Sequence, residues 1–180
     1  MSSIPPIFLI TGVPGAGKTS VAEMLMQRFP FGVHIPVDSI RDWVQGGKAH
    51  PLPLWTDEAT RQFRLARRMA VETARLYGAE GFAAAIDDVV FPEEAERIYV
   101  EPLSGHLLHK VLLRPKIETA LDRNATRLNK IFDTGLLTEF IPGIHEAMSE
   151  SEFREAGWMV IDSSELTIEG TVDDILRRVG

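Results

Sequence analysis

The segment from Gly12 to Thr19 constrains the fold of this chain more than any other feature. It reads GVPGAGKT and matches the pattern G-x-x-x-x-G-K-[ST] at every fixed position. An apolar run at 7–10 precedes it and apolar residues at helical spacing follow it, so it should connect a buried strand to a helix. Glycines let backbone N–H groups turn inward around an anion, and the helix N-terminus adds the positive end of its dipole. The segment therefore predicts a phosphate-binding loop.

The side chains at the end of this loop have expected roles. Lys18 should reach the β- and γ-phosphates of a nucleotide, and the hydroxyl of Thr19 should bind Mg²⁺. A glycine-rich turn without a ligand is the alternative, and the strand and helix on either side argue against it. The residues expected to bind the nucleotide are Gly12, Pro14, Gly15, Ala16, Gly17, Lys18, Thr19 and Ser20.

The rest of the chain alternates short apolar segments with longer helical patterns. Strands are expected at 7–11, 33–37, 81–86, 107–113 and 158–161. Helices are expected at 18–28, 57–77, 115–127, 137–148 and 171–179, with a short helix that begins at Pro92. This alternation predicts an α/β fold in which helices cover both faces of a five-stranded parallel sheet. The length of 180 residues fits one domain, so we expect residues 1–180 to form a single unit.

The composition excludes several classes of function. The chain has 19 Lys and Arg against 26 Asp and Glu, and its net charge of −7 argues against a strongly basic nucleic-acid coat. It has no cysteine, so disulfides, thiolate nucleophiles and cysteine-ligated zinc are impossible. The longest apolar stretch near the start is too short for a membrane span or a signal sequence. We therefore expect a soluble, cytoplasmic protein.

A carboxylate and a guanidinium follow the second expected strand. Asp38 comes directly after that strand, and Arg41 comes three residues later. The carboxyl end of this strand lies at the same sheet edge as the phosphate loop. There Asp38 could accept a proton from an attacking hydroxyl, and Arg41 could hold Asp38 or a phosphate in place. Asp38 could instead cap the helix that begins near Ile40, but beside an intact phosphate loop we favour catalysis.

Two consecutive acids, Asp87 and Asp88, end the third expected strand. An acid after a hydrophobic strand can support the Mg²⁺ shell through water. The alternative is a cap for the turn or helix before Pro92. We assign Asp88 as the candidate metal ligand, although the pattern by itself does not separate it from Asp87.

Two arginines, Arg123 and Arg127, lie four residues apart and should share one helix face. Closing over a triphosphate, they would stabilise charge on the transferring phosphoryl group. A solvated basic face, neutralised by Asp122 or Glu118, is the alternative.

Five segments in order along the chain resemble those of a known group of proteins: GVPGAGKT, VDSIR, AIDDV, RNATR and VIDSS. The chain resembles the small P-loop kinases of the chloramphenicol phosphotransferase, zeta-toxin and polynucleotide 5′-kinase type, often labelled AAA-family ATPases. The resemblance implies a three-layer αβα P-loop NTPase fold with a helical lid at about 115–135, and ATP as the nucleotide.

The resemblance also implies roles for single residues: that Asp38 is the general base, that Arg41 contacts substrate or phosphate, and that Arg123 and Arg127 belong to the lid. The loop at 162–164 would lie near the adenine. The stretch LNKIF after Arg127 is less basic than many lids of this group.

The favoured function is transfer of the γ-phosphoryl group of ATP to a hydroxyl of a small molecule, as in chloramphenicol phosphotransferase. Candidate pocket walls are Trp43, His50, Trp55 and Phe91, although each is more often a packing residue than a ligand contact.

A second hypothesis is a polynucleotide or nucleoside 5′-hydroxyl kinase, in which Arg61, Arg64, Arg67 and Arg68 would contact the phosphates. The net charge and the lack of interleaved aromatic residues favour a solvated helix face for these arginines. A third hypothesis is an ATP-binding regulatory or toxin-like module with slow hydrolysis. The oligomeric state is not indicated.

Overall fold

The computed structural model describes residues 4–51, 54–126 and 134–180, with the side chains of 134–137 outside the description. Within these residues the chain forms a five-stranded sheet in the order β2-β3-β1-β4-β5, and every neighbouring pair of strands is parallel. The strands are β1 (Pro6–Thr11), β2 (Gly32–Pro36), β3 (Ala83–Asp87), β4 (Leu107–Leu113) and β5 (Met159–Ile161). The predicted five-stranded parallel α/β fold is confirmed.

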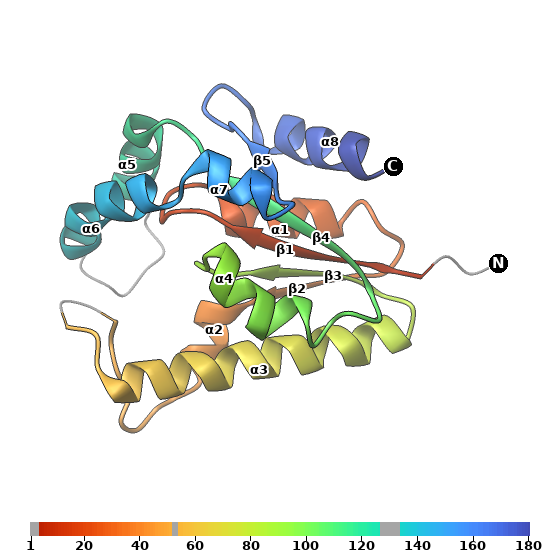
Figure 1. The fold of residues 1–180 in the computed structure, drawn as a ribbon, viewed down its shortest axis with the longest axis horizontal. Coiled ribbons are helices and arrows are strands. Elements are labelled where there is room, and N and C mark those ends of the chain that lie inside the picture. Colours follow the sequence, from red (N-terminus) through yellow and green to blue (C-terminus); the bar gives the residue numbers. More distant parts are fainter. Residues whose placement is uncertain (1–3, 52–53, 127–133) are drawn as a thin grey trace.

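Helices connect the strands and cover the sheet (Figure 1). Those before β4 are α1 (Lys18–Met26), α2 (Val37–Arg41), α3 (Asp57–Ala79), α4 (Pro92–Ala95) and the π-helical turn η1 (Glu96–Val100). Those after β4 are α5 (Ile117–Ala125), α6 (Thr134–Ala147), α7 (Glu150–Glu155) and α8 (Ile168–Val179). None of the helices in the described part of the chain combines the length and apolar character that a membrane-spanning segment needs.

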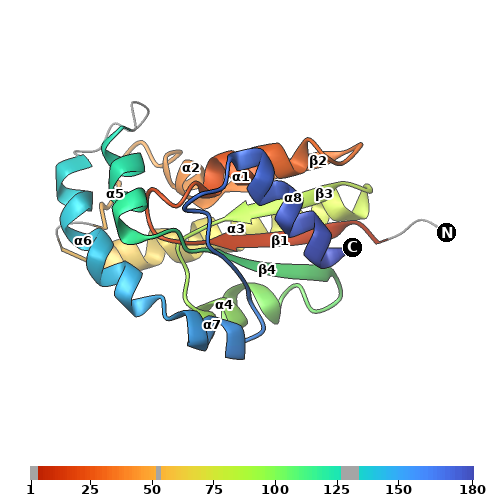
Figure 2. The same cartoon turned by 90° about the horizontal axis from the view of Figure 1, so that it is seen from above.

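The sheet separates two helical layers. Helices α1 and α8 pack against each other over one face, whereas α3 lies along the other face beside β2 and β3 (Figures 1 and 2). Phe8, Leu9 and Ile86 in the central strands are fully buried, as expected for parallel strands covered on both faces. Helices α5 and α6 pack against each other beyond the carboxyl ends of the strands, next to the loop that follows β1 (Figure 1).

Several boundaries differ from the prediction. Val37, expected in the second strand, is the first residue of α2, so Asp38 lies in a helical turn rather than before one. The helix expected at 115–127 spans only Ile117–Ala125, because Pro115 and Lys116 remain in the connection from β4. Helix α7 was not predicted, since its six residues contain a single buried apolar side chain, that of Phe153, and therefore show no apolar periodicity.

Candidate active site

At three positions of the loop between β1 and α1, the backbone has a conformation that strongly favours glycine. Gly12, Gly15 and Gly17 have φ angles of 150°, 86° and 92°. A Cβ on Gly12 would lie 2.4 Å from the carbonyl oxygen of Leu113, and one on Gly15 would lie 2.1 Å from that of Ala120. The loop thus packs directly on the end of β4 and on α5, and its left-handed residues turn the main chain as a phosphate cradle requires.

Lys18 is the first residue of α1, and its side chain folds back over the loop. Its Nζ donates hydrogen bonds to the carbonyl oxygens of Gly12, at 2.8 Å, and Val13, at 3.2 Å. The residue is 8% exposed, so the ammonium group lies at the loop and not in solvent. Thr19 follows it in the first turn of α1, where the partial positive charge of the helix end is concentrated. This arrangement suits a polyanion.

Asp38 and Arg41 lie on the same helical turn, at the sheet edge where the phosphate loop begins. The Asp38 carboxylate is 55% exposed, and its Oδ1 is 3.7 Å from Nη1 of Arg41. Arg41 is only 5% exposed, and its Nη2 donates to the carbonyl oxygen of Ala49 at 2.9 Å. Its Cζ lies 3.7 Å from the ring centroid of Phe63. Burial lowers the pKa of Arg41, and nearby carboxylates, Asp38 first, oppose that shift.

Asp87 and Asp88 point to opposite faces of the sheet. Asp87 pairs with Ile10 in the β1–β3 register, and the N–H of Asp88 donates to the carbonyl of Ile10, so the backbone stays extended through both residues. Successive side chains of an extended backbone alternate between faces. His34 Nε2 contacts Asp87 Oδ2 at 2.6 Å, and His34 in turn lies 3.9 Å from Glu23 of α1. Asp87 therefore faces the layer that contains α1, and Asp88 faces α3.

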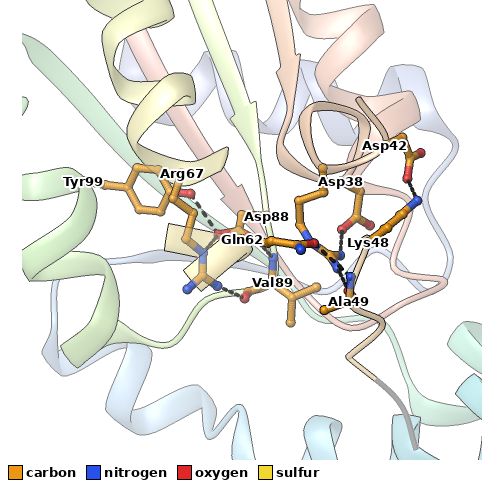
Figure 3. A network of polar contacts seen from close by, with 10 residues as sticks. Asp38, Asp42, Lys48, Ala49, Gln62, Arg67, Asp88, Val89 and Tyr99 are labelled. Carbon is orange, nitrogen blue, oxygen red and sulfur yellow. Dashed lines mark hydrogen bonds and ion pairs between the residues drawn. The ribbon is translucent and has the colours of Figure 1, made fainter. Parts of the chain in front are cut away.

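The carboxylate of Asp88 is part of a buried ion pair (Figure 3). Its Oδ2 accepts from Arg67 Nε at 2.7 Å and from Tyr99 Oη at 2.8 Å, while its Oδ1 accepts from the N–H of Val89 at 2.8 Å. Arg67 also bonds Glu94 and the carbonyl of Val89. Burial raises the pKa of Asp88, and Arg67 opposes the shift. These contacts engage both oxygens of the acid that we assigned to the metal.

The predicted lid is described only in part. Arg123 lies on α5, and its Nη2 donates to the carbonyl oxygen of Ser163 at 2.9 Å. The N–H of Lys116 donates to Ser164 Oγ at 2.7 Å, so α5 is connected at two points to the loop after β5. Arg127 lies outside the described residues, and its predicted pairing with Arg123 stays a prediction.

The aromatic and basic candidates around α3 divide into packing and exposed residues. Trp55 stacks on Phe63 with centroids 4.9 Å apart, Phe91 packs against the core, and Trp43 is 65% exposed. The prediction of a solvated face on α3 is confirmed for Arg61, Arg64 and Arg68 but is wrong for Arg67, which is 6% exposed. Its position beside Ala66 and Ala70, which are buried on the same helix face, is the signal that the sequence offered.

Sequence reasoning also missed His34, Gln62 and Tyr99, each of which contacts a predicted site residue or a neighbouring loop. Their partners are 11 to 53 residues away along the chain, so no local pattern identified them. Within the described residues, His, Asp and Glu side chains form no group of three or more that could hold a metal ion by themselves. A Mg²⁺ ion here would take most of its ligands from nucleotide phosphates and water.

Residues 7–135 match the family described as "AAA domain". The chain belongs to this family. No curated protein sequence matches it. As a member of the AAA domain family, the chain has a fold shared with known structures of P-loop kinases.

Three of the similar solved structures cover nearly the whole chain. The tunicamycin resistance protein of Deinococcus radiodurans is 20% identical, with a TM-score of 0.63 over 98% of this chain and 96% of its own. A sugar kinase from Janibacter sp. is 19% identical, with a TM-score of 0.64 over 97% and 94%. The shikimate kinase of Acinetobacter baumannii, in complex with shikimate, is 18% identical, with a TM-score of 0.65 over 99% and 94%. At these identities the likeness establishes the fold.

Proposed function

We propose that this chain is an ATP-dependent kinase that transfers the γ-phosphoryl group to a hydroxyl of a small molecule, with Asp38 as the general base. The observation that carries the proposal is an exposed carboxylate at the sheet edge of a glycine-rich loop that holds a buried lysine. Phosphoryl transfer needs little covalent chemistry from the protein, so a positioned base and a cationic cradle supply its main requirements.

The proposed step balances as a simple displacement. The acceptor oxygen forms a bond to the γ-phosphorus as the bond from that phosphorus to the β,γ-bridging oxygen breaks, and ADP leaves. The carboxylate of Asp38 accepts the hydroxyl proton. Lys18 would move from the carbonyls of Gly12 and Val13 to the β- and γ-phosphates. Arg123, and Arg127 if it joins the lid, would balance the charge of the transferred group.

For Mg²⁺, which neutralises phosphate charge when bound, we propose Thr19 and Asp87 rather than Asp88. The oxygens of Asp88 accept from Arg67, Tyr99 and Val89 on the α3 side of the sheet. Asp87 instead lies on the side of α1, the helix that carries Thr19, and His34 contacts one of its oxygens, Oδ2. A hydrogen-bonded carboxylate is a usual ligand of a metal shell.

A small hydroxylated acceptor is supported over a polynucleotide. Two of the similar structures bear the names sugar kinase and shikimate kinase. Arg67, one of four arginines that could track phosphates, is committed to a buried ion pair, and Arg61 bonds Glu58. An alcohol of the chloramphenicol type remains the acceptor that the sequence motifs favour. The other acceptors to be compared with it are shikimate, sugars, nucleosides and oligonucleotides with a 5′-hydroxyl.

The test combines an acceptor screen with one substitution. Labelled ATP is incubated with each class of acceptor, and the best acceptor is then used with Asp38→Asn. We expect phosphoryl transfer to fall by about 10²–10⁴-fold because the base is lost, while ATP affinity stays within about twofold. Asp173→Asn, on α8, is the matched control and should behave as the wild type. Full transfer by Asp38→Asn would overturn the base assignment, and ATP hydrolysis without transfer to any acceptor would favour a regulatory module.

A further inference from the structure

The segment from Gly46 to His50, which we call the acceptor loop, follows α2 closely and is held by side chains from two helices. It has no regular secondary structure. Its main chain is nevertheless hydrogen-bonded at Ala49, through both the N–H and the carbonyl oxygen of that residue. The N–H belongs to the peptide group between Lys48 and Ala49. The N–H of Ala49 donates to Gln62 Oε1 at 3.0 Å (Figure 3). The carbonyl oxygen of Ala49 accepts from Arg41 Nη2 at 2.9 Å.

Gln62 is a buried side chain of α3, 5% exposed, and its amide group makes three hydrogen bonds. Its Nε2 donates to the carbonyl oxygen of Gly47 at 2.8 Å and to Glu58 Oε1 at 2.6 Å. Hydrogen bonds from Arg61 and Gln62 lower the pKa of Glu58 to about 2, so its carboxylate is ionised at neutral pH. A carboxylate and a carbonyl both require a donor, which fixes the amide with Oε1 toward Ala49.

Arg41 connects the same loop to the proposed base. One guanidinium group lies 3.7 Å from Asp38 through Nη1 and bonds Ala49 through Nη2. Its Nε is buried and has no hydrogen-bond partner among the residues that the structure describes. Stacking on Phe63 fixes the plane of the group. A guanidinium that is 5% exposed and already bonded in this way is poorly placed to contact an acceptor.

We propose that Arg41 and Gln62 are positioning residues, which clamp the acceptor loop at Ala49 and so fix one wall of the acceptor site beside Asp38. This inference rests on the proposed function for the identity of the site, but the clamp itself is a property of the folded chain. It replaces the expected role of Arg41 as a substrate contact. Gln62 acquires a role that no sequence motif suggested.

Trypsin provides a direct probe of the clamp, because the bond it would cleave after Lys48 is the clamped Lys48–Ala49 bond. Gln62→Met removes the hydrogen bonds to Ala49 and Gly47 while keeping an unbranched side chain of similar length. Loss of two such bonds should raise the rate of cleavage after Lys48 about tenfold, measured by mass spectrometry of the fragment that ends there. Arg41→Lys should act similarly, since one ammonium cannot bond Asp38 and Ala49 and also stack on Phe63.

Gln45→Met is the matched control. Gln45 is exposed, and its Nε2 bonds the carbonyl of Asp42, outside the acceptor loop. Trypsin should cleave the Gln45→Met variant after Lys48 at the same rate as the wild type. An unchanged rate in Gln62→Met, or an equal increase in Gln45→Met, would overturn the clamp.

Kinetics test whether the clamp serves the acceptor. With the best acceptor from the screen, Gln62→Met should raise the acceptor KM about tenfold, with the KM for ATP within about twofold. A role in folding alone would leave both constants of the folded fraction unchanged. Faster cleavage with an unchanged acceptor KM would therefore overturn the positioning role. If the wild type phosphorylates no acceptor, the proposed function fails, whereas the cleavage ratio still supports or overturns the clamp.

Discussion

The glycines of the phosphate loop differ in the reason why each must be glycine. Gly15 has a φ of 86° and its missing Cβ would lie 2.1 Å from the carbonyl oxygen of Ala120. Gly17 has a similar φ of 92°, but nothing lies within 4 Å of the Cβ position. Position 15 therefore requires glycine both for its left-handed backbone and for its close contact with α5. Position 17 requires glycine for its left-handed backbone alone.

Alanine substitutions should separate these two reasons. Gly17→Ala should lower the free energy of unfolding by about 1–2 kcal/mol through the left-handed backbone. Gly15→Ala should lower it by about 3 kcal/mol or more, because α5 must also shift. Urea unfolding followed by circular dichroism measures both values. Gly46→Ala, which meets neither restriction, is the control. Equal losses at positions 15 and 17 would contradict the close packing of the loop on α5.

The buried ion pair of Arg67 joins three elements that the sequence separates. Arg67 comes from α3, Asp88 follows β3, and Tyr99 belongs to η1, the π-helical turn after α4. Burial also raises the pKa of Tyr99 well above its usual value, so its hydroxyl remains protonated and donates to Asp88. The network holds the carboxyl end of β3 against α3, which also carries the clamp residue Gln62.

Removing one partner should leave an uncompensated charge in this network. Arg67→Met should lower the free energy of unfolding by about 3–5 kcal/mol. The double variant Arg67→Met/Asp88→Leu should recover part of that loss, because both buried charges are then absent. Chemical denaturation measures these values, with exposed Arg68→Met as a control expected within about 0.5 kcal/mol of the wild type. A double variant as unstable as the sum of its single variants would show that the pair is not coupled.

At the scale of the whole molecule, the phosphate loop joins β1, the end of β4 and α5. A ligand bound there contacts a site that exists only when the sheet and α5 are assembled. Binding to the folded state alone stabilises a protein by mass action, by about 2.7 kcal/mol at 100 times the dissociation constant. Nucleotide binding should therefore stabilise the entire fold rather than one segment.

Thermal unfolding should report this linkage. Mg²⁺–ATP at 100 times its dissociation constant should raise Tm by about 5–10 °C for a chain of this size. Lys18→Met should remove most of the shift at the same ligand concentration, because the phosphates lose their principal cation. Lys110→Met is the matched control. Lys110 is a half-buried lysine of β4, and it bonds the carbonyl of Ala156, the residue that follows α7. A full shift in Lys18→Met would contradict nucleotide binding at this loop.

The sequence alone determined the features that depend on neighbouring residues. Apolar runs predicted all five strands, and the fixed positions of GVPGAGKT predicted the loop between β1 and α1. Asp38 follows β2 closely, as predicted, although Val37 separates it from the strand and already begins α2. The pattern at 87–88 indicated two acids, and we assigned Asp88 to the metal although the pattern did not distinguish it from Asp87. Each face of the sheet is identified only by the helices that cover it.

Tertiary structure decided which side chains meet. Arg67 and Asp88 are 21 residues apart, and His34 and Asp87 are 53 apart, so no helical or strand periodicity relates them. The parallel order β2-β3-β1 brings the carboxyl ends of three strands to one edge of the sheet. At that edge Asp87 contacts His34 on one face, and Asp88 contacts Arg67 on the other face. Periodicity and motif spacing are local properties of a chain, whereas a hydrogen-bond partner depends on how distant segments pack.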